Sequence, residues 1–307
     1  MSNKSFKEVS ELWKSDKKQY VKVSTFSAYA LILENHLVPA FGQKTEISEK
    51  DVQEFVMQSL DGGLSQKTVH DFIVVLKMVV RFGARNGCDW KSDWALKFPT
   101  EQQKKELEVL SIDNHRRIMQ YVRDNFSFRN LGIYICLSCG LRIGEICALT
   151  WDDVDVSEGV IMIRKTLERV SVIEGGERHT KLMLGTPKTR NSVRDIPMTR
   201  ELLQVMKPLV KIVNPKYYVL SNAAKPLEPR TYRNYYMSLM KRIGVPALKF
   251  HGLRHSFATR CIESNCDYKT VSVLLGHSNI GTTLNLYVHP NLEQKKRCIN
   301  KALKFMK

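Results

Sequence analysis

A tyrosine, two histidines and an arginine lie close together near the carboxyl end of the 307-residue sequence. They are His251 and Arg254 in HGLRH, His277 in LLGHSN and Tyr287 in TTLNLYVHP. Residues three apart share a helix face, so His251 and Arg254 can approach the same ligand. Arginine binds phosphate oxygens in bidentate fashion, histidine transfers protons, and a tyrosine hydroxyl can attack phosphorus. These residue types at this spacing therefore predict phosphate chemistry that needs neither a metal nor a nucleotide.

Further groups suited to the same chemistry lie upstream. Arg142 is in SCGLRIGEI, where a glycine ends one predicted helix and the next helix offers free amide groups that also favour an anion. Glu145 follows three residues later and can hold the arginine through a charge-assisted hydrogen bond. Lys188, in the polar turn GTPKTRN, is expected at or near a hairpin tip from which it can donate a proton. Lys181, on the same strand pair, is the alternative. Taken singly, the pair Arg142 and Glu145 also fits a surface ion pair, and Lys188 a solubilising lysine.

A metal site is the competing interpretation. His251 and His255 have the four-residue spacing of a zinc pair, but Gly252 stands where such a hydrolase carries its glutamate. Cys136 and Cys139 also have metal or redox spacing, yet no second pair follows and the surrounding run is apolar. We therefore expect no metal, two buried thiols, and a packing or capping role for His255.

The composition indicates a two-domain chain with a polyanionic partner. The 48 Lys and Arg against 31 Asp and Glu give a formal net charge of +17, which favours nucleic acid and, second, an anionic membrane surface. The length exceeds what one core usually supports. There is no spanning apolar run and no signal peptide, and seven cysteines make no disulfide framework. These features predict a cytoplasmic protein.

Helical spacing of apolar residues predicts four helices between residues 5 and 86. The third begins with a capping box at Ser48 and Asp51, and the fourth begins at Ser65. The polar, lysine-rich stretch that follows interrupts the pattern and predicts an interdomain linker. The expected division is a helical domain at 1–100, a linker at 101–109 and a second domain at 110–307.

The second domain is expected to be mixed. Its first helices lead to Gly140, after which LRIGEICALT begins a new helix. Alternating β-branched residues then predict strands at 159–173, 181–184 and 192–197, in one three-stranded antiparallel sheet. The remainder is helical, so the expected fold class is mainly α with a small antiparallel β-sheet (α+β). The last helix has an apolar stripe that packs either on its own domain or on a neighbouring protomer; the stripe consists of Leu292, Ile299, Ala302, Leu303 and Met306.

The motifs GLRIGE, HGLRHSFAT, LLGHS and LYVHP together resemble the active-site motifs of the tyrosine recombinase (phage integrase) family. The resemblance covers residues 110–307, and residues 5–86 are similar, more weakly, to the family's helical core-binding (SAM-like) bundle. It implies a C-shaped clamp around DNA. It also implies a site-specific recombinase that cleaves and rejoins strands through a 3′-phosphotyrosyl intermediate, for integration, excision or inversion of DNA, without a cofactor.

Residue roles follow from the same resemblance. It implies the nucleophile at Tyr287, the phosphate clamp at Arg142 and Arg254, the general acid at Lys188, a proton acceptor or phosphate ligand at His251, a phosphate hydrogen-bond donor at His277, and a supporting carboxylate at Glu145.

The implied partners are double-stranded DNA and three further copies of the chain, in a homo-tetramer on two DNA sites. An accessory DNA-bending protein is a further partner, no membrane is involved, and the expected place is the nucleoid in the cytoplasm. Two alternatives remain at this point. One is a type IB topoisomerase-like nicking-closing enzyme, and the other is a DNA-binding regulator without catalysis.

Overall fold

The computed structural model describes most of the chain, namely residues 4–100, 108–174, 177–187, 189–246 and 248–287, with 295, 296, 299, 300 and 303. Lys188, most of the predicted linker and most of the predicted last helix lie outside the described residues. By contacts the chain divides into two units. One comprises residues 1–105 with 170–181, and the other comprises 106–169 with 182–307.

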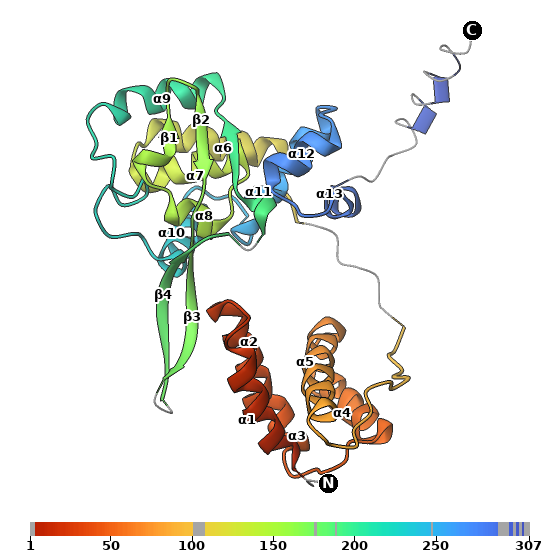
Figure 1. Cartoon of the computed structure of the whole chain (residues 1–307). Coiled ribbons are helices and arrows are strands. Elements are labelled where there is room, and N and C mark those ends of the chain that lie inside the picture. Colours follow the sequence, from red (N-terminus) through yellow and green to blue (C-terminus); the bar gives the residue numbers. More distant parts are fainter. Residues whose placement is uncertain are drawn as a thin grey trace. The chain divides into compact units, whose positions relative to one another are not determined.

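The amino-terminal unit contains a helical bundle, drawn from red to orange in Figure 1. Its helices are α1 (Phe6–Lys17), α2 (Val23–Ile32), α3 (Val38–Phe41), α4 (Glu49–Asp61) and α5 (Gln66–Arg85), and a π-helical turn, η1 (Leu33–Leu37), joins α2 to α3. The capping box predicted before α4 is present, because Ser48 Oγ accepts from the Asp51 amide at 3.2 Å and Asp51 accepts from the Ser48 amide at 3.0 Å. The four expected helices are confirmed, the second being continued by η1 and α3.

In the carboxyl-terminal unit, helices pack around a larger hydrophobic core. Its helices are α6 (Ile112–Asp124), α7 (Phe128–Cys139), α8 (Ile143–Ala148), α9 (Arg200–Val210), α10 (Pro229–Arg242), α11 (His251–Glu263), α12 (Tyr268–Leu275) and α13 (Ile280–Tyr287), with the short 3-10 turns η2 (Trp151–Asp153) and η3 (Arg190–Ser192). Helix α7 is buried along most of its length, including Cys136 and Cys139, as predicted. It ends at Gly140, whose φ of 66° is left-handed and suits glycine.

The strands form two antiparallel sheets where we expected one. Among the described residues, β1 (Val154–Asp155), β2 (Val160–Ile163) and β5 (Arg194–Pro197) make a three-stranded sheet, and β3 (Thr166–Glu174) and β4 (Glu177–Gly185) make a separate two-stranded sheet. The predicted strand 159–173 is broken at Arg164 and Lys165. Their side chains bind the Arg194 carbonyl at 3.0 Å and the Asp153 carboxylate at 2.8 Å.

This second sheet also corrects the pairing predicted for 181–184 and 192–197. Because β4 and β5 belong to different sheets, these two strands do not pair with each other as a hairpin. The class α+β, mainly helical with small antiparallel sheets, is confirmed. Across the described residues, no helix is both long and apolar enough to cross a membrane.

Candidate active site

Arg142 caps the amino end of α8, directly after the turn that ends α7. The hydrogen bond expected with Glu145 is present, since Arg142 Nη1 donates to Glu145 Oε1 at 2.7 Å. The Arg142 amide also donates to Glu145 Oε2 at 2.9 Å. The Glu145 side chain is 2% exposed and that of Arg142 is 35% exposed. The carboxylate therefore lies below the arginine, and the guanidinium still faces solvent.

Arg254, on α11, is almost completely buried at 1% exposure. Its Nη1 donates to the Gly140 carbonyl at 2.9 Å, and its Nη2 donates to the Leu275 carbonyl. These carbonyls lie at the carboxyl ends of α7 and α12, where helix carbonyls lack partners and a cation is favoured. Burial and the charge of Arg142 lower the pKa of Arg254 to about 9, so the guanidinium stays charged at neutral pH.

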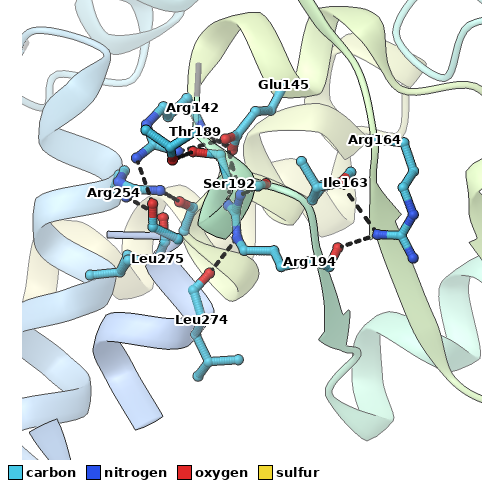
Figure 2. Close-up of polar contacts among 12 residues, drawn as sticks. Arg142, Glu145, Ile163, Arg164, Thr189, Ser192, Arg194, Arg254, Leu274 and Leu275 are labelled. Carbon is cyan, nitrogen blue, oxygen red and sulfur yellow. Dashed lines mark hydrogen bonds and ion pairs between the residues drawn. The ribbon is translucent and has the colours of Figure 1, made fainter. Parts of the chain in front are cut away.

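Arg194, on β5, is a third arginine of the cluster and was not predicted (Figure 2). Its Nη1 and Nη2 donate to Oε1 and Oε2 of Glu145 at 3.0 and 2.9 Å. Its Nε donates to the Leu274 carbonyl at 2.6 Å, and Nη1 also donates to the Ser192 carbonyl at 3.0 Å. A buried guanidinium needs this many partners to offset its desolvation. Arg194 thus joins β5, α8 and the end of α12.

The charge of Glu145 is held by its arginines. Burial alone would raise the pKa of Glu145, but hydrogen bonding and charge from Arg194, together with the charge of Arg142, outweigh it and lower the pKa to about 2. The carboxylate therefore stays ionised at pH values well above 2.

His277 follows the left-handed Gly276 at the end of α12, as the sequence indicated. Its Nδ1 lies 2.9 Å from Thr283 Oγ1, which fixes the ring from α13. Partial burial and the charges of Arg254 and Arg142 lower the pKa of His277 to about 4. The ring is neutral at pH 7, and an anion bound beside it would raise that pKa.

Tyr287 ends α13 and is 8% exposed. Its hydroxyl lies 2.6 Å from Nδ1 of His255, on α11. Burial raises the pKa of Tyr287, while the nearby charges of Arg254 and Arg142 lower it in part. His251, one turn before His255, lies in an edge-to-face arrangement with it, the ring centroids being 4.6 Å apart. The structure therefore brings tyrosine, histidines and arginines into one neighbourhood.

A cavity of about 450 Å³ opens beside this cluster. Among the residues that line it are Arg142, Glu145, Ser192, Gly276 and His277. A guanidinium and an imidazole facing one cavity suit an anion the size of a phosphodiester.

The predicted site residues Arg142, Glu145, His251, Arg254, His277 and Tyr287 are all found in this region, whereas Lys188 lies outside the described residues. The alternative lysine, Lys181, lies in β4. Sequence reasoning missed Arg194 and assigned His255 to packing. A signal existed for both. Arg194 is two residues before Ile196 and so faces inward with it on β5, and His255 shares the helix face of His251.

A helical bundle followed by an α+β domain that holds a buried tyrosine near two arginines and a histidine is the architecture of tyrosine-type site-specific DNA recombinases. The model described as Phage integrase family matches residues 108–294, and the model described as Phage integrase, N-terminal SAM-like domain matches residues 5–59. The first match covers more than half of the sequence. The chain belongs to the phage integrase family, and the predicted class of enzyme is confirmed.

Curated relatives carry names of the same kind. The chain is 27% identical over 304 residues to a "Tyrosine recombinase XerC-like" protein of Caldanaerobacter subterraneus subsp. tengcongensis, covering 91% of this chain and 77% of that one. It is 25% identical over 267 residues to the transposase from transposon Tn916 of Enterococcus faecalis. That match covers 80% of this chain and spans only 64% of the transposase.

Solved structures share the fold. The Tn1549 transposon integrase in complex with transposon right end DNA superposes with a TM-score of 0.77 at 21% identity, covering 97% of this chain and 99% of that one. Lambda integrase (residues 75–356) bound to DNA gives a TM-score of 0.61 at 15% identity, with 89% and 92% covered.

Proposed function

We propose that this chain cleaves and rejoins double-stranded DNA at specific sites, with Tyr287 as the nucleophile. The observation that carries the proposal is the Tyr287 hydroxyl, whose pKa is raised by burial while the charges of Arg254 and Arg142 offset part of that rise. Cations placed there stabilise the charge that develops on a phosphate under attack. The net charge of +17 favours DNA as the carrier of that phosphate.

The proposed reaction is a transfer of one phosphodiester bond. Tyr287 Oη attacks phosphorus, the bond to O5′ breaks, and a 3′-phosphotyrosine forms while the leaving oxygen takes a proton from Lys188. Arg142 and Arg254 bind the non-bridging oxygens, and His277 donates a hydrogen bond to one of them. A 5′-hydroxyl from a partner strand then reverses the step, so the bond energy is retained and no ATP is needed.

Glu145 and His251 have supporting roles in this proposal. Glu145 fixes the guanidinium of Arg142 through the 2.7 Å hydrogen bond. Partial burial and the neighbours His255 and Arg254 lower the pKa of His251 to about 4, so its ring is neutral at pH 7. The neutral ring can bind the phosphate or accept a proton.

Strand exchange requires two duplexes, so the proposed working form is a homo-tetramer on two DNA sites in the nucleoid of the cytoplasm. Among the solved relatives, one lambda integrase structure is a tetramer bound to a Holliday junction, with a TM-score of 0.64 at 15% identity. A DNA-bending protein is a further proposed partner. The proposed division of the chain is a DNA-binding helical domain at 1–100, a linker at 101–109 and a catalytic domain at 110–307.

The test uses the full chain and a duplex selected for binding from a random library, with a nick beside the cleavage position. The nick releases a short fragment and traps the covalent complex. We expect a protein–DNA adduct that survives denaturation and that Tyr287→Phe abolishes without loss of DNA binding. An adduct that persists in Tyr287→Phe would show that Tyr287 is not the nucleophile. Joining of two duplexes, and not only relaxation of a supercoiled circle, distinguishes a recombinase from a topoisomerase-like enzyme.

A further inference from the structure

The contact between His255 and Tyr287 has the geometry of proton transfer. His255 Nδ1 and Tyr287 Oη are 2.6 Å apart, and they are held by α11 and α13. The two residues are 32 positions apart in the sequence, so the contact is made by the fold and not by a shared helix. A group that removes a proton must lie within about 2.6–3.2 Å of the atom that carries it.

The charges around this pair keep His255 neutral, and in the tautomer that carries its proton on Nε2 the Nδ1 atom accepts from the Tyr287 hydroxyl. Partial burial and the charge of Arg254 lower the pKa of His255, so its ring is neutral at pH 7 and has one nitrogen with a free lone pair. The other titratable and charged groups that act on the pair are His251, on the same helix, and Arg142, which caps α8. Both arginines favour the anionic form of the phenol that results when the proton leaves.

The other two histidines of the site are placed differently. His277 has its Nδ1 at 2.9 Å from Thr283 Oγ1. His251 contacts the ring of His255 at a centroid distance of 4.6 Å. Within the described residues, His255 is the histidine that has a hydrogen bond with Tyr287.

We propose that His255 is the general base that removes the proton from Tyr287 during DNA cleavage. The Oη–H bond breaks and the proton moves to His255 Nδ1, while the Oη–phosphorus bond forms and the phosphorus–O5′ bond breaks. The O5′ oxygen receives its proton from the separate acid, Lys188. In the rejoining step the phosphorus–Oη bond breaks and His255 returns its proton to the phenol. This inference rests on the proposed function and adds a residue with a defined role to it.

The main experiment measures the single-turnover rate of adduct formation on the nicked duplex. His255→Gln keeps a polar side chain of similar length but cannot act as a base, and we expect the rate to fall by about 10² to 10³-fold. DNA affinity should stay within about twofold, since the phosphate-binding arginines are retained. His115→Gln, at a partly buried histidine of α6 that the cavity of the site does not include, is the matched control and should react as the unaltered chain does.

A chemical rescue separates a base from a structural support. Difluorotyrosine at position 287 has a more acidic phenol and needs a base less, so it should restore most of the rate lost in His255→Gln. A 5′-bridging sulfur in the DNA removes the need to protonate the leaving group and should not rescue this variant. In the unaltered chain the rate should fall as pH drops through the pKa of His255, which burial and Arg254 hold below its ordinary value, because the neutral form is lost there, and His255→Gln should lack that fall.

The outcomes separate the two proposals. A normal rate in His255→Gln, or a slowed rate that difluorotyrosine does not restore, would overturn the role of His255 while an adduct on Tyr287 keeps the proposed function. Absence of any Tyr287-dependent adduct in the unaltered chain would remove the proposed function itself.

Discussion

Arg194 and Glu145 form a two-point ion pair, with both guanidinium nitrogens Nη1 and Nη2 within 3.0 Å of the carboxylate oxygens. The pair joins β5 to α8, and both side chains are almost fully buried, at 5% and 2% exposure. Because Glu145 also accepts from Arg142, the carboxylate lies between one buried arginine and one that faces the cavity (Figure 2). Arg194 therefore orients Arg142 without itself reaching solvent.

Replacing Arg194 with methionine should destabilise the carboxyl-terminal unit by about 3 kcal/mol, because a buried carboxylate then loses half of its partners. The rate of adduct formation should also fall, since Glu145 would hold Arg142 less firmly. Thermal unfolding of the full chain and the nicked-duplex assay measure the two effects.

Arg116→Met is the matched control. Arg116 pairs with Asp113 at the surface of the same unit, with side-chain exposures of 77% and 88%, and such pairs contribute about 0–1 kcal/mol. Equal losses of stability and of reaction rate in the two variants would contradict the role of Arg194 in holding Glu145 and Arg142.

Acidification should destabilise the chain through His277. The pKa of His277 is about 4 in the folded chain, against an ordinary value of 6.5, so between these values the unfolded chain binds protons that the folded chain does not. Stability therefore falls as pH decreases from 6.5 towards 4. His277→Gln should show a weaker pH dependence of the unfolding temperature in this window. An unchanged pH dependence would mean that the ring is not shielded in the folded chain.

DNA binding near pH 5 should take up protons. A phosphate beside His277 favours the charged ring and raises its pKa from about 4, so free protein that is mostly neutral there becomes protonated on binding. Calorimetry in two buffers of different ionisation enthalpy measures the number of protons. His277→Gln should take up fewer protons, and an equal uptake would place the phosphate elsewhere.

Gly276→Ala tests how tightly the end of α12 packs against the turn before β5. Gly276 has φ of 64°, and a Cβ there would lie 2.9 Å from the Asn191 carbonyl oxygen and 3.1 Å from Arg194 Nη1. We expect backbone strain to lower the free energy of unfolding by about 1–2 kcal/mol. The close contacts should lower it further, and the cleavage reaction should be slower.

Gly159→Ala provides the comparison for that substitution. Its φ of 69° gives the same backbone strain, but the nearest atom to an added Cβ is Leu203 Cδ2 at 3.7 Å, an ordinary contact. The difference in unfolding temperature between the two variants therefore measures the destabilisation that the close contacts at Gly276 cause. A difference of zero would mean that the turn moves freely.

Local features of the fold could be predicted from the sequence because their signals are local. The cap at Ser48 and the hydrogen bond of Arg142 with Glu145 each join residues three apart, and the structure contains both. The glycine after α7 could likewise be expected to adopt a left-handed conformation at Gly140.

Contacts between distant residues could not be predicted in the same way. Alternation continues from 159 to 173 in the sequence, yet Arg164 and Lys165 bind groups outside the strand and divide it. Two partners of Arg194, Glu145 and Leu274, lie 49 and 80 residues away, so the spacing of residues along the chain gives no indication of them. His255 was assigned to packing because its partner, Tyr287, comes from another helix.

The last turn of α12 offers a way to adjust the reaction from the protein surface. Its consecutive carbonyls, at Leu274 and Leu275, receive the side chains of Arg194 and Arg254. A small displacement of this helix end would therefore shift two cations together. Val273, on the same turn, is 57% exposed, so substitutions there are candidates for tuning the enzyme in directed evolution without replacing either arginine.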